Sequence, residues 1–255
     1  MPVDPALSVL ADSIESEGPW PRPSCPNCKS GFIRFSDPET TESYESRRER
    51  NNEAWDPEWI HGTFTVDGTC ENHECQLSVH GTGDYRVDWS SRTQDFDTHG
   101  PLYSEYFKLT HLHPPMMIMP IPKTAPEEVK AGVLRASRVL FADPGLAATA
   151  LRATVERFLT SEGVASEVNG SFRTAHQRIA EWLGTDIERE STGRLLFAVK
   201  WLGNAGTHED ADLTTTEVLE GAMMLDEAFH RVYTGPDIDA RAQTINLAKG
   251  PSRTP

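Results

Sequence analysis

Residues 25–28 read CPNC and residues 70–75 read CENHEC, and these two stretches decide the fold of the first half of the chain. Each cysteine pair can sit on one tight turn that points both thiols to the same side, so that four thiolates surround one tetrahedral zinc ion. Four protein ligands leave no open position for water, which predicts a structural zinc. We therefore predict that the zinc ligands are Cys25, Cys28, Cys70 and Cys75.

The second spacing is wider than the first, because four residues separate Cys70 from Cys75, and it admits His73 as a substitute ligand. Two other interpretations stay open: free cysteines buried as small apolar residues, or disulfide partners. Residues 1–20 contain acidic residues and no basic region ahead of an apolar run, unlike a secretory signal. We expect a cytoplasmic protein, in which zinc ligation is favoured over disulfides.

Strand-like alternation of apolar and polar residues follows the first cysteine pair. Three segments are rich in β-branched and aromatic residues and are bounded by Gly, Asp and Ser, namely 62–70, 76–90 and 103–114. The polar segment 35–59 is expected to be a helical excursion or a loop inserted between the pairs. This pattern predicts a zinc-ribbon β domain over residues 25–113, after a lead-in over residues 1–24 with a short helix around Pro5–Ser16.

The pattern becomes helical after HPPMMIMPIP (113–122), a run that suits neither a helix nor a central strand. We expect an extended linker over residues 114–123. Five amphipathic helices are expected next, within 125–142, 143–163, 172–184, 189–204 and 214–235. The predicted fold is α+β, with a small zinc-ribbon β domain, then an all-α bundle of about five helices over residues 124–235, then a disordered tail over residues 236–255.

The charge distribution limits the kinds of partner. The formal net charge is −15, and residues 1–122 hold 9 Lys and Arg against 20 Asp and Glu. Tight non-specific binding to nucleic acid requires basic residues that neutralise phosphates, so this balance argues against it, and the acidic front half favours a protein ligand. The chain has no uninterrupted apolar run of the roughly 18 residues that a membrane span requires.

A second candidate site lies in KWLGNAGTHED (200–210). Lys200, Asn204 and His208 are spaced four apart and would share one face if the helix continued through them. Gly203 and Gly206 are costly inside a helix, and they would let another helix, a second subunit or a ligand backbone come close.

Several single features have plain structural explanations. Arg152 and Glu156, also four apart, are consistent with a solvated helix pair, and a histidine near a helix end is consistent with a cap. His111 and His113 in HLHPP are expected to pack near the linker. A zinc hydrolase is disfavoured because no H-E-x-x-H motif occurs, and a zinc-ribbon transcription factor because the ribbon lacks a basic cluster.

VKWLGNAGTHE, placed after the helix with AATALRATVE and behind paired cysteines that flank a β segment, resembles a known arrangement. It is similar to a bacterial family of unknown function that joins a zinc ribbon to a helical domain of the HEPN superfamily, over about Cys25 to Tyr233. The resemblance implies a helical bundle that forms homodimers or higher homo-oligomers. It also implies a metal-independent endoribonuclease of toxin or antiphage defence systems.

The superfamily signature is an Arg, often followed by a polar residue such as Asn, with a His roughly four to six positions after the Arg. Asn204 and His208 match it, but Gly203 stands where the Arg belongs, and Lys200 is the cation one turn earlier. The resemblance then implies that His208 is the base or acid and that Lys200 and Arg152 hold the phosphate. Asn204 would orient the histidine or the scissile group, and Glu156 would position Arg152.

The implied partners are an RNA substrate and a phage protein bound through the zinc-ribbon half. The missing Arg favours the alternative, a non-catalytic adaptor or regulatory binding protein of the same fold.

Overall fold

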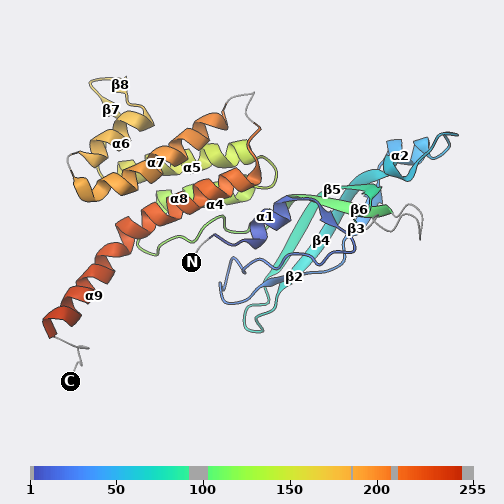
Figure 1. Ribbon diagram of the computed structural model, residues 1–255, viewed down its shortest axis with the longest axis horizontal. Helices are drawn as coiled ribbons and strands as arrows, with labels where there is room; N and C mark the ends of the chain where they lie inside the picture. The colour runs from blue at the N-terminus through green and yellow to red at the C-terminus, as the bar shows by residue number, and fades with distance from the viewer. Residues whose placement is uncertain (1–2, 92–102, 185, 208–211, 249–255) are drawn as a thin grey trace. The chain divides into compact units, whose positions relative to one another are not determined.

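The computed structural model describes residues 3–91, 103–184, 186–207 and 212–248 (Figure 1). The fold is a mixture of α-helices and β-strands in two compact units. One unit comprises Asp4–Met117 with Ser137–Asp143, and the other comprises the N-terminal residues up to Val3, Ile118–Ala136 and the chain from Pro144 on. The chain passes from the sheet unit to the helical unit between Met117 and Ile118, inside the segment 114–123 that was expected to be a linker.

The first unit is built on an antiparallel six-stranded sheet in the order β1-β6-β5-β4-β2, with β3 also paired to β4. Its strands are β1 (Ile14–Glu15), β2 (Ile33–Phe35), β3 (Glu39–Glu42), β4 (His61–Cys70), β5 (Ser78–Trp89) and β6 (Tyr103–His113). The three longest, β4, β5 and β6, correspond to the three segments that the alternation predicts. A short helix, α1 (Ala6–Ala11), precedes the sheet.

One face of this sheet is the core of the unit. Along β4, Phe64 and Val66 are buried while their neighbours are exposed, as the two-residue period of a strand requires. Trp20, from the Pro-rich lead-in, packs on this face with its ring centroid 6.0 Å from that of Phe64 and 6.1 Å from that of Phe107. The lead-in therefore contributes to the core.

The inserted segment 35–59 contains an additional strand, which the sequence prediction missed. β3 pairs with β4, and it is followed by α2 (Tyr44–Glu49) and a 3-10 turn, η1 (Pro57–Trp59). Ser43 caps α2 by accepting a hydrogen bond from the Ser46 amide at 3.0 Å. The strand was missed because ETTE has no apolar residue, and its pairing comes from backbone hydrogen bonds along β4.

The second unit contains the five expected helices, except that the last turn of the first one, from Ser137, belongs to the sheet unit. They are α4 (Glu127–Val139), α5 (Pro144–Ser161), α6 (Ala175–Leu183), α7 (Ile187–Ala205) and α8 (Thr215–Tyr233), with a hairpin of β7 (Glu167–Val168) and β8 (Ser171–Phe172) between α5 and α6. Thr174 and Thr214 begin α6 and α8 with complete capping boxes. Phe158 and Phe229, both fully buried, join α5 to α8 with ring centroids 5.6 Å apart.

The tail differs from the prediction. Gly235–Ala248 form a further helix, α9, where disorder was expected from residue 236 on, and residues 249–255 lie outside the described part (Figure 1). Pro236 falls in the first turn, where proline is tolerated, and the residues after it include good helix formers such as Ala240 and Ala242. Local propensity thus favours a helix in a segment whose polarity indicated disorder.

Candidate functional sites

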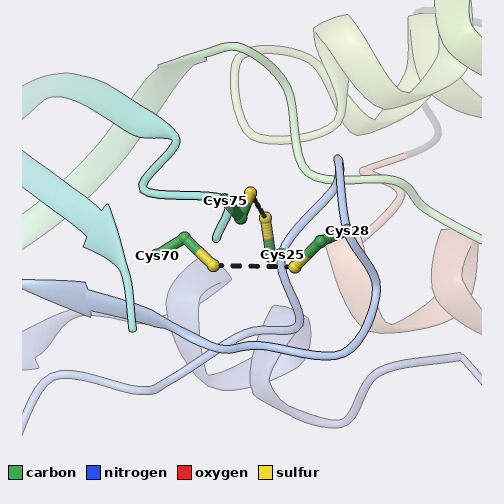
Figure 2. Close-up of side chains that lie close together, drawn as sticks. All are labelled: Cys25, Cys28, Cys70 and Cys75. Atoms are coloured by element: carbon green, nitrogen blue, oxygen red, sulfur yellow. Dashed lines mark hydrogen bonds between the residues drawn. The ribbon is translucent and has the colours of Figure 1, made fainter. Parts of the chain in front are cut away.

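The four cysteines meet at one point, between the turn that precedes β2 and the turn that follows β4 (Figure 2). The Sγ atoms of Cys25 and Cys75 are 3.8 Å apart, and those of Cys28 and Cys70 are 3.7 Å apart. All four Sγ atoms lie within 4.8 Å of one another. Among the described residues, they form the only group of three or more histidine, cysteine or acidic side chains with this closeness.

These separations suit a shared metal ion. A tetrahedral ion with metal–sulfur bonds of about 2.3 Å places its ligands about 3.8 Å apart, whereas a disulfide requires about 2.0 Å between sulfurs. All four thiols are free, and Cys25 and Cys70 are buried. The cluster can therefore hold one metal ion with four protein ligands, and soft thiolate donors favour zinc over magnesium or calcium.

Two tight backbone turns aim the thiols. The residue after the second cysteine of each pair has a positive φ, 58° at Lys29 and 46° at Gln76. Gly31 passes so close to the cluster that a Cβ on it would lie 2.7 Å from the Sγ of Cys70. Sequence analysis identified the cysteines but not these turns, since Lys and Gln give no sign of a left-handed conformation.

Hydrogen bonds and burial shift the pKa values of the thiols in opposite directions. Hydrogen bonds from Ser30 lower the pKa of the Cys28 thiol to about 5. Burial raises the pKa of the Cys70 thiol to about 12. A hydrogen bond from the Asn27 side chain, 3.4 Å from the sulfur, lowers the pKa of Cys75. Without a metal the cluster therefore holds thiols of very different acidity, and ligation of one cation by all four requires their deprotonation.

His73 is not part of the cluster. Its side chain is exposed, and the set of converging ligand atoms consists of the four cysteines. The wide spacing in CENHEC is accommodated by Asn72, whose side chain accepts a hydrogen bond from the Glu74 amide at 3.0 Å and whose carbonyl accepts one from the Cys75 amide at 2.9 Å.

The second cluster lies between α5 and α7. Arg152 on α5 donates from Nη1 to Oδ1 of Asn204 on α7 at 2.8 Å, and from Nε to Oε1 of Glu156 at 3.2 Å. Three of the five residues expected to act together are therefore in direct contact. Arg152 and Glu156 are about one third exposed, at 33% and 36%.

Lys200 adjoins this cluster but is only 7% exposed. Its Nζ lies 3.0 Å from the centroid of the Trp201 ring. Burial, together with the nearby charge of Arg152, lowers the pKa of the Lys200 ammonium. The lysine therefore contributes a largely desolvated positive charge close enough to interact with Arg152.

The two glycines of KWLGNAGTHED have a packing role within the chain. A Cβ on Gly203 would lie 2.3 Å from the Cβ of Arg152 and 2.8 Å from the carbonyl oxygen of Ala148. A Cβ on Gly206 would lie 2.3 Å from the carbonyl oxygen of Gly145. Of the three partners that the sequence left open, another helix of the same chain, α5, makes the close approach.

α7 ends at Ala205, three residues before His208, so the expected helical row does not continue to that residue. The amide of Thr207 donates to the carbonyl of Asn204 at 3.0 Å, which forms a turn. His208 itself lies outside the described residues.

His111 and His113 were expected to pack near the linker. They line one depression together with Pro115 of that segment, and their side chains are exposed on β6, which pairs with β5 across Thr82 and His80.

Residues 15–111 match a model described as "Domain of unknown function (DUF8608)", and residues 134–248 match one described as "Domain of unknown function (DUF4145)". No curated protein and no solved structure matches the chain significantly. No described helix is long and apolar enough to cross a membrane. The first matched region covers most of the sheet, the second covers the end of α4 and the helices after it, and neither description assigns an activity.

Proposed function

We propose that this chain is a metal-independent endoribonuclease of a toxin or antiphage defence system, in which a HEPN-like helical unit cleaves RNA. The observation that carries the proposal is the 2.8 Å hydrogen bond from Arg152 to Asn204. It brings a guanidinium from α5 to the GNAGTH segment, where Gly203 stands in place of the signature Arg. In this proposal, an arginine from a neighbouring helix takes over the role that the superfamily gives to the arginine of its motif.

RNA cleavage without a metal needs three groups. A base removes the proton from the ribose 2′-hydroxyl, cations stabilise the charge that develops on the phosphorane, and an acid protonates the leaving 5′-oxygen. We assign the base or acid role to His208, because an unperturbed imidazole pKa near 6.5 allows either role at neutral pH. In a homodimer two such faces supply two histidines, one for each role.

Arg152 is suited to hold the phosphate. Its Nε and Nη1 are occupied by Glu156 and Asn204, whereas Nη2 has no hydrogen-bond partner within the described residues. A guanidinium held at two nitrogens and open at the third is pre-organised to donate to a phosphate oxygen. Glu156 then positions Arg152, Asn204 links the arginine to the histidine segment, and buried Lys200 adds positive charge to the site.

In this proposal the cysteine cluster carries a structural zinc, and the sheet unit binds a protein such as a phage component. Four thiolate ligands would fill the coordination sphere of zinc and leave no position for a substrate. The first 122 residues contain 20 acidic and 9 basic residues, and this negative balance favours a protein ligand over RNA for this unit.

The test is induced expression in the host, with and without phage, followed by growth and total RNA integrity. We expect wild type to arrest growth and fragment RNA in at least one condition. His208→Ala and Arg152→Ala should leave RNA intact while staying folded and oligomeric. His230→Ala, at an exposed histidine on α8, is the matched control and should behave as wild type. Intact RNA in every condition would overturn the proposal that the chain is a nuclease.

A non-catalytic adaptor is the second candidate, and one observation favours it. The atoms that would crowd a residue other than glycine at position 203 are the Cβ of Arg152 and the Ala148 carbonyl, so helix packing alone explains this departure from the signature. Under the adaptor proposal wild type and His208→Ala both leave RNA intact, and both retain the same oligomeric state in analytical ultracentrifugation.

A further inference from the structure

Three histidines that belong to neither of the clusters described above, His80, His111 and His113, are exposed on one face of the sheet. Asp67, His80 and His113 are register partners across β4, β5 and β6, and Thr65, Thr82 and His111 form the adjacent row. Directly opposed residues in antiparallel strands have Cβ atoms about 4.5–5.5 Å apart, and diagonal neighbours are still within reach of long side chains. The sheet thus places imidazoles from two strands on one surface.

A β-bulge in β6 sets which residues of that strand face the histidine side of the sheet. The pairing shifts between Thr82, opposite His111, and Gly83, opposite Leu109, so Thr110 is an extra residue. Leu109 and Leu112 both face the core although they are three residues apart, and His111 and His113 both face outward. Gly83 permits the close approach at the bulge, because a Cβ there would lie 2.0 Å from the carbonyl oxygen of Lys108.

Asp67 orients one of the imidazoles. Its Oδ1 lies 2.7 Å from Nδ1 of His80 and accepts a hydrogen bond from it, although both side chains are largely exposed. This bond fixes the tautomer in which Nε2 of His80 carries a free lone pair, and Nε2 has no partner within the described residues. A carboxylate behind a histidine is the usual support of a metal-ligating imidazole, and it raises the basicity of the ligating nitrogen.

We propose that His80 and His113 bind one divalent late transition-metal ion on this face, with Asp67 as the supporting carboxylate. Imidazole nitrogen suits zinc, nickel and copper. The imidazole nitrogens of these histidines do not converge on one point as the cysteine sulfurs do. The remaining coordination positions of the metal are therefore filled by water or by His111, whose exposed side chain can rotate towards the ion. The site is exchangeable, in contrast to the four-thiolate cluster, and it is independent of the proposed nuclease.

An anion is the competing ligand. An open depression of about 530 Å³ covers this part of the sheet, and exposed Arg138, from the Ser137–Asp143 segment of the same unit, lines it together with the histidines. Arg138 repels a metal ion but attracts phosphate, so its removal affects the two ligands in opposite directions.

The experiment is calorimetric titration of zinc-loaded full-length protein with Ni²⁺, and separately with inorganic phosphate. We expect wild type to bind one additional Ni²⁺, His80→Ala and His113→Ala to lose it, and Asp67→Asn to weaken it by about 10- to 100-fold, as is typical for supporting residues. Arg138→Gln should bind Ni²⁺ at least as well as wild type. His61→Ala, at an exposed histidine of β4 opposite Arg86, is the matched control and should leave the affinity unchanged.

Circular dichroism melting confirms that each variant is folded, and a colorimetric assay confirms that zinc is not released. Absence of an additional Ni²⁺, or equal Ni²⁺ affinity in wild type, His80→Ala and His113→Ala, would overturn the proposal. So would phosphate binding that Arg138→Gln abolishes, which would identify an anion site.

Discussion

The cysteine cluster and the Arg152 cluster both join distant parts of the chain, but they are stabilised in different ways. Four thiols converge on one centre at separations that suit a tetrahedral ion, and as thiolates they would repel one another unless a cation lay between them. Arg152, Glu156 and Asn204 satisfy one another through two hydrogen bonds, and helix packing holds them in place. We therefore expect the first site to depend on a bound ion for its stability, whereas the hydrogen bonds of the second are formed without any ligand.

Loss of the metal should therefore produce the largest effect, confined to the sheet. We predict that Cys70→Ser abolishes metal binding and removes most of the stability of the sheet unit. Binding free energies of structural zinc in small domains, about 10–16 kcal/mol, match or exceed the total stability of a typical domain. Hydrogen exchange should show lost protection in β4 and β5 and unchanged protection in α5 and α7. The metal content of purified protein provides the second readout.

Asn27→Ala is the control for this experiment, since it removes a hydrogen bond to Cys75 and leaves all four thiolates. Normal protection of β4 and β5 in metal-free Cys70→Ser would show that the cluster does not support the sheet.

The α5–α7 contact should respond to added volume. We predict that Gly203→Ala destabilises the helical unit by about 1–3 kcal/mol, the usual cost of overpacking, because the new Cβ meets the Cβ of Arg152 and the backbone of Ala148. Gly221→Ala on α8 is the matched control. Its Cβ meets the end of the flexible Leu202 side chain at 2.8 Å, and alanine favours the helix by about 1 kcal/mol. Urea denaturation followed by circular dichroism measures both variants.

A stabilising effect of Gly203→Ala, or equal destabilisation by Gly221→Ala, would mean that α5 and α7 are less tightly packed than the distances indicate.

The cysteine cluster and the α5–α7 contact also differ in how far the sequence could predict them. The cysteine cluster could be identified because each pair is local, and the three long strands and five helices because their apolar residues repeat with the right period. β3 was missed because ETTE has no such pattern, and α9 because a polar exposed helix has no apolar face to detect.

The contact between Arg152 and Asn204, 52 residues apart, depends on which helices pack together. Spacing alone does not determine that. The resemblance to HEPN domains brought the two residues into one hypothesis, and the glycines explain why the helices can approach. The histidine face was missed because it depends on the bulge at Thr110, and a bulge has no sequence signal as strong as a cysteine pair.

Acid should weaken the sheet unit through Glu15 as well as through the thiolates. Hydrogen bonds from Ser91, and further ones from Ser90, lower the pKa of Glu15 from 4.5 to about 2. Because the folded-state pKa is depressed, the stabilisation is complete above about pH 5 and is lost as the pH falls from 4.5 towards 2. We predict that Glu15→Gln costs about 1 kcal/mol at pH 7, a modest value for charge-assisted hydrogen bonds near the surface.

The measurement is urea denaturation of the sheet unit of zinc-loaded wild type and Glu15→Gln at several pH values. The difference between the two proteins isolates Glu15 from the acid sensitivity of the thiolates. It should shrink as the pH approaches 2. A constant difference from pH 7 to pH 3 would contradict the assignment.

The smallest effect is expected for the Arg152–Asn204 hydrogen bond, and it tests whether this cluster is formed without a ligand. A double-mutant cycle with Arg152→Ala and Asn204→Ala should give a coupling energy of about 0.5–1 kcal/mol in urea denaturation, since the arginine is 33% exposed and water competes for both groups. The same cycle with Glu156→Ala in place of Asn204→Ala should give a coupling of about 0.3–0.5 kcal/mol, as expected for an exposed pair four residues apart on a helix. Coupling to Asn204 that is no stronger than coupling to Glu156 would mean that Arg152 is held by its own helix alone. The guanidinium would then have to be ordered by the substrate, and the contrast with the cysteine cluster would disappear, because both sites would depend on a ligand for their geometry.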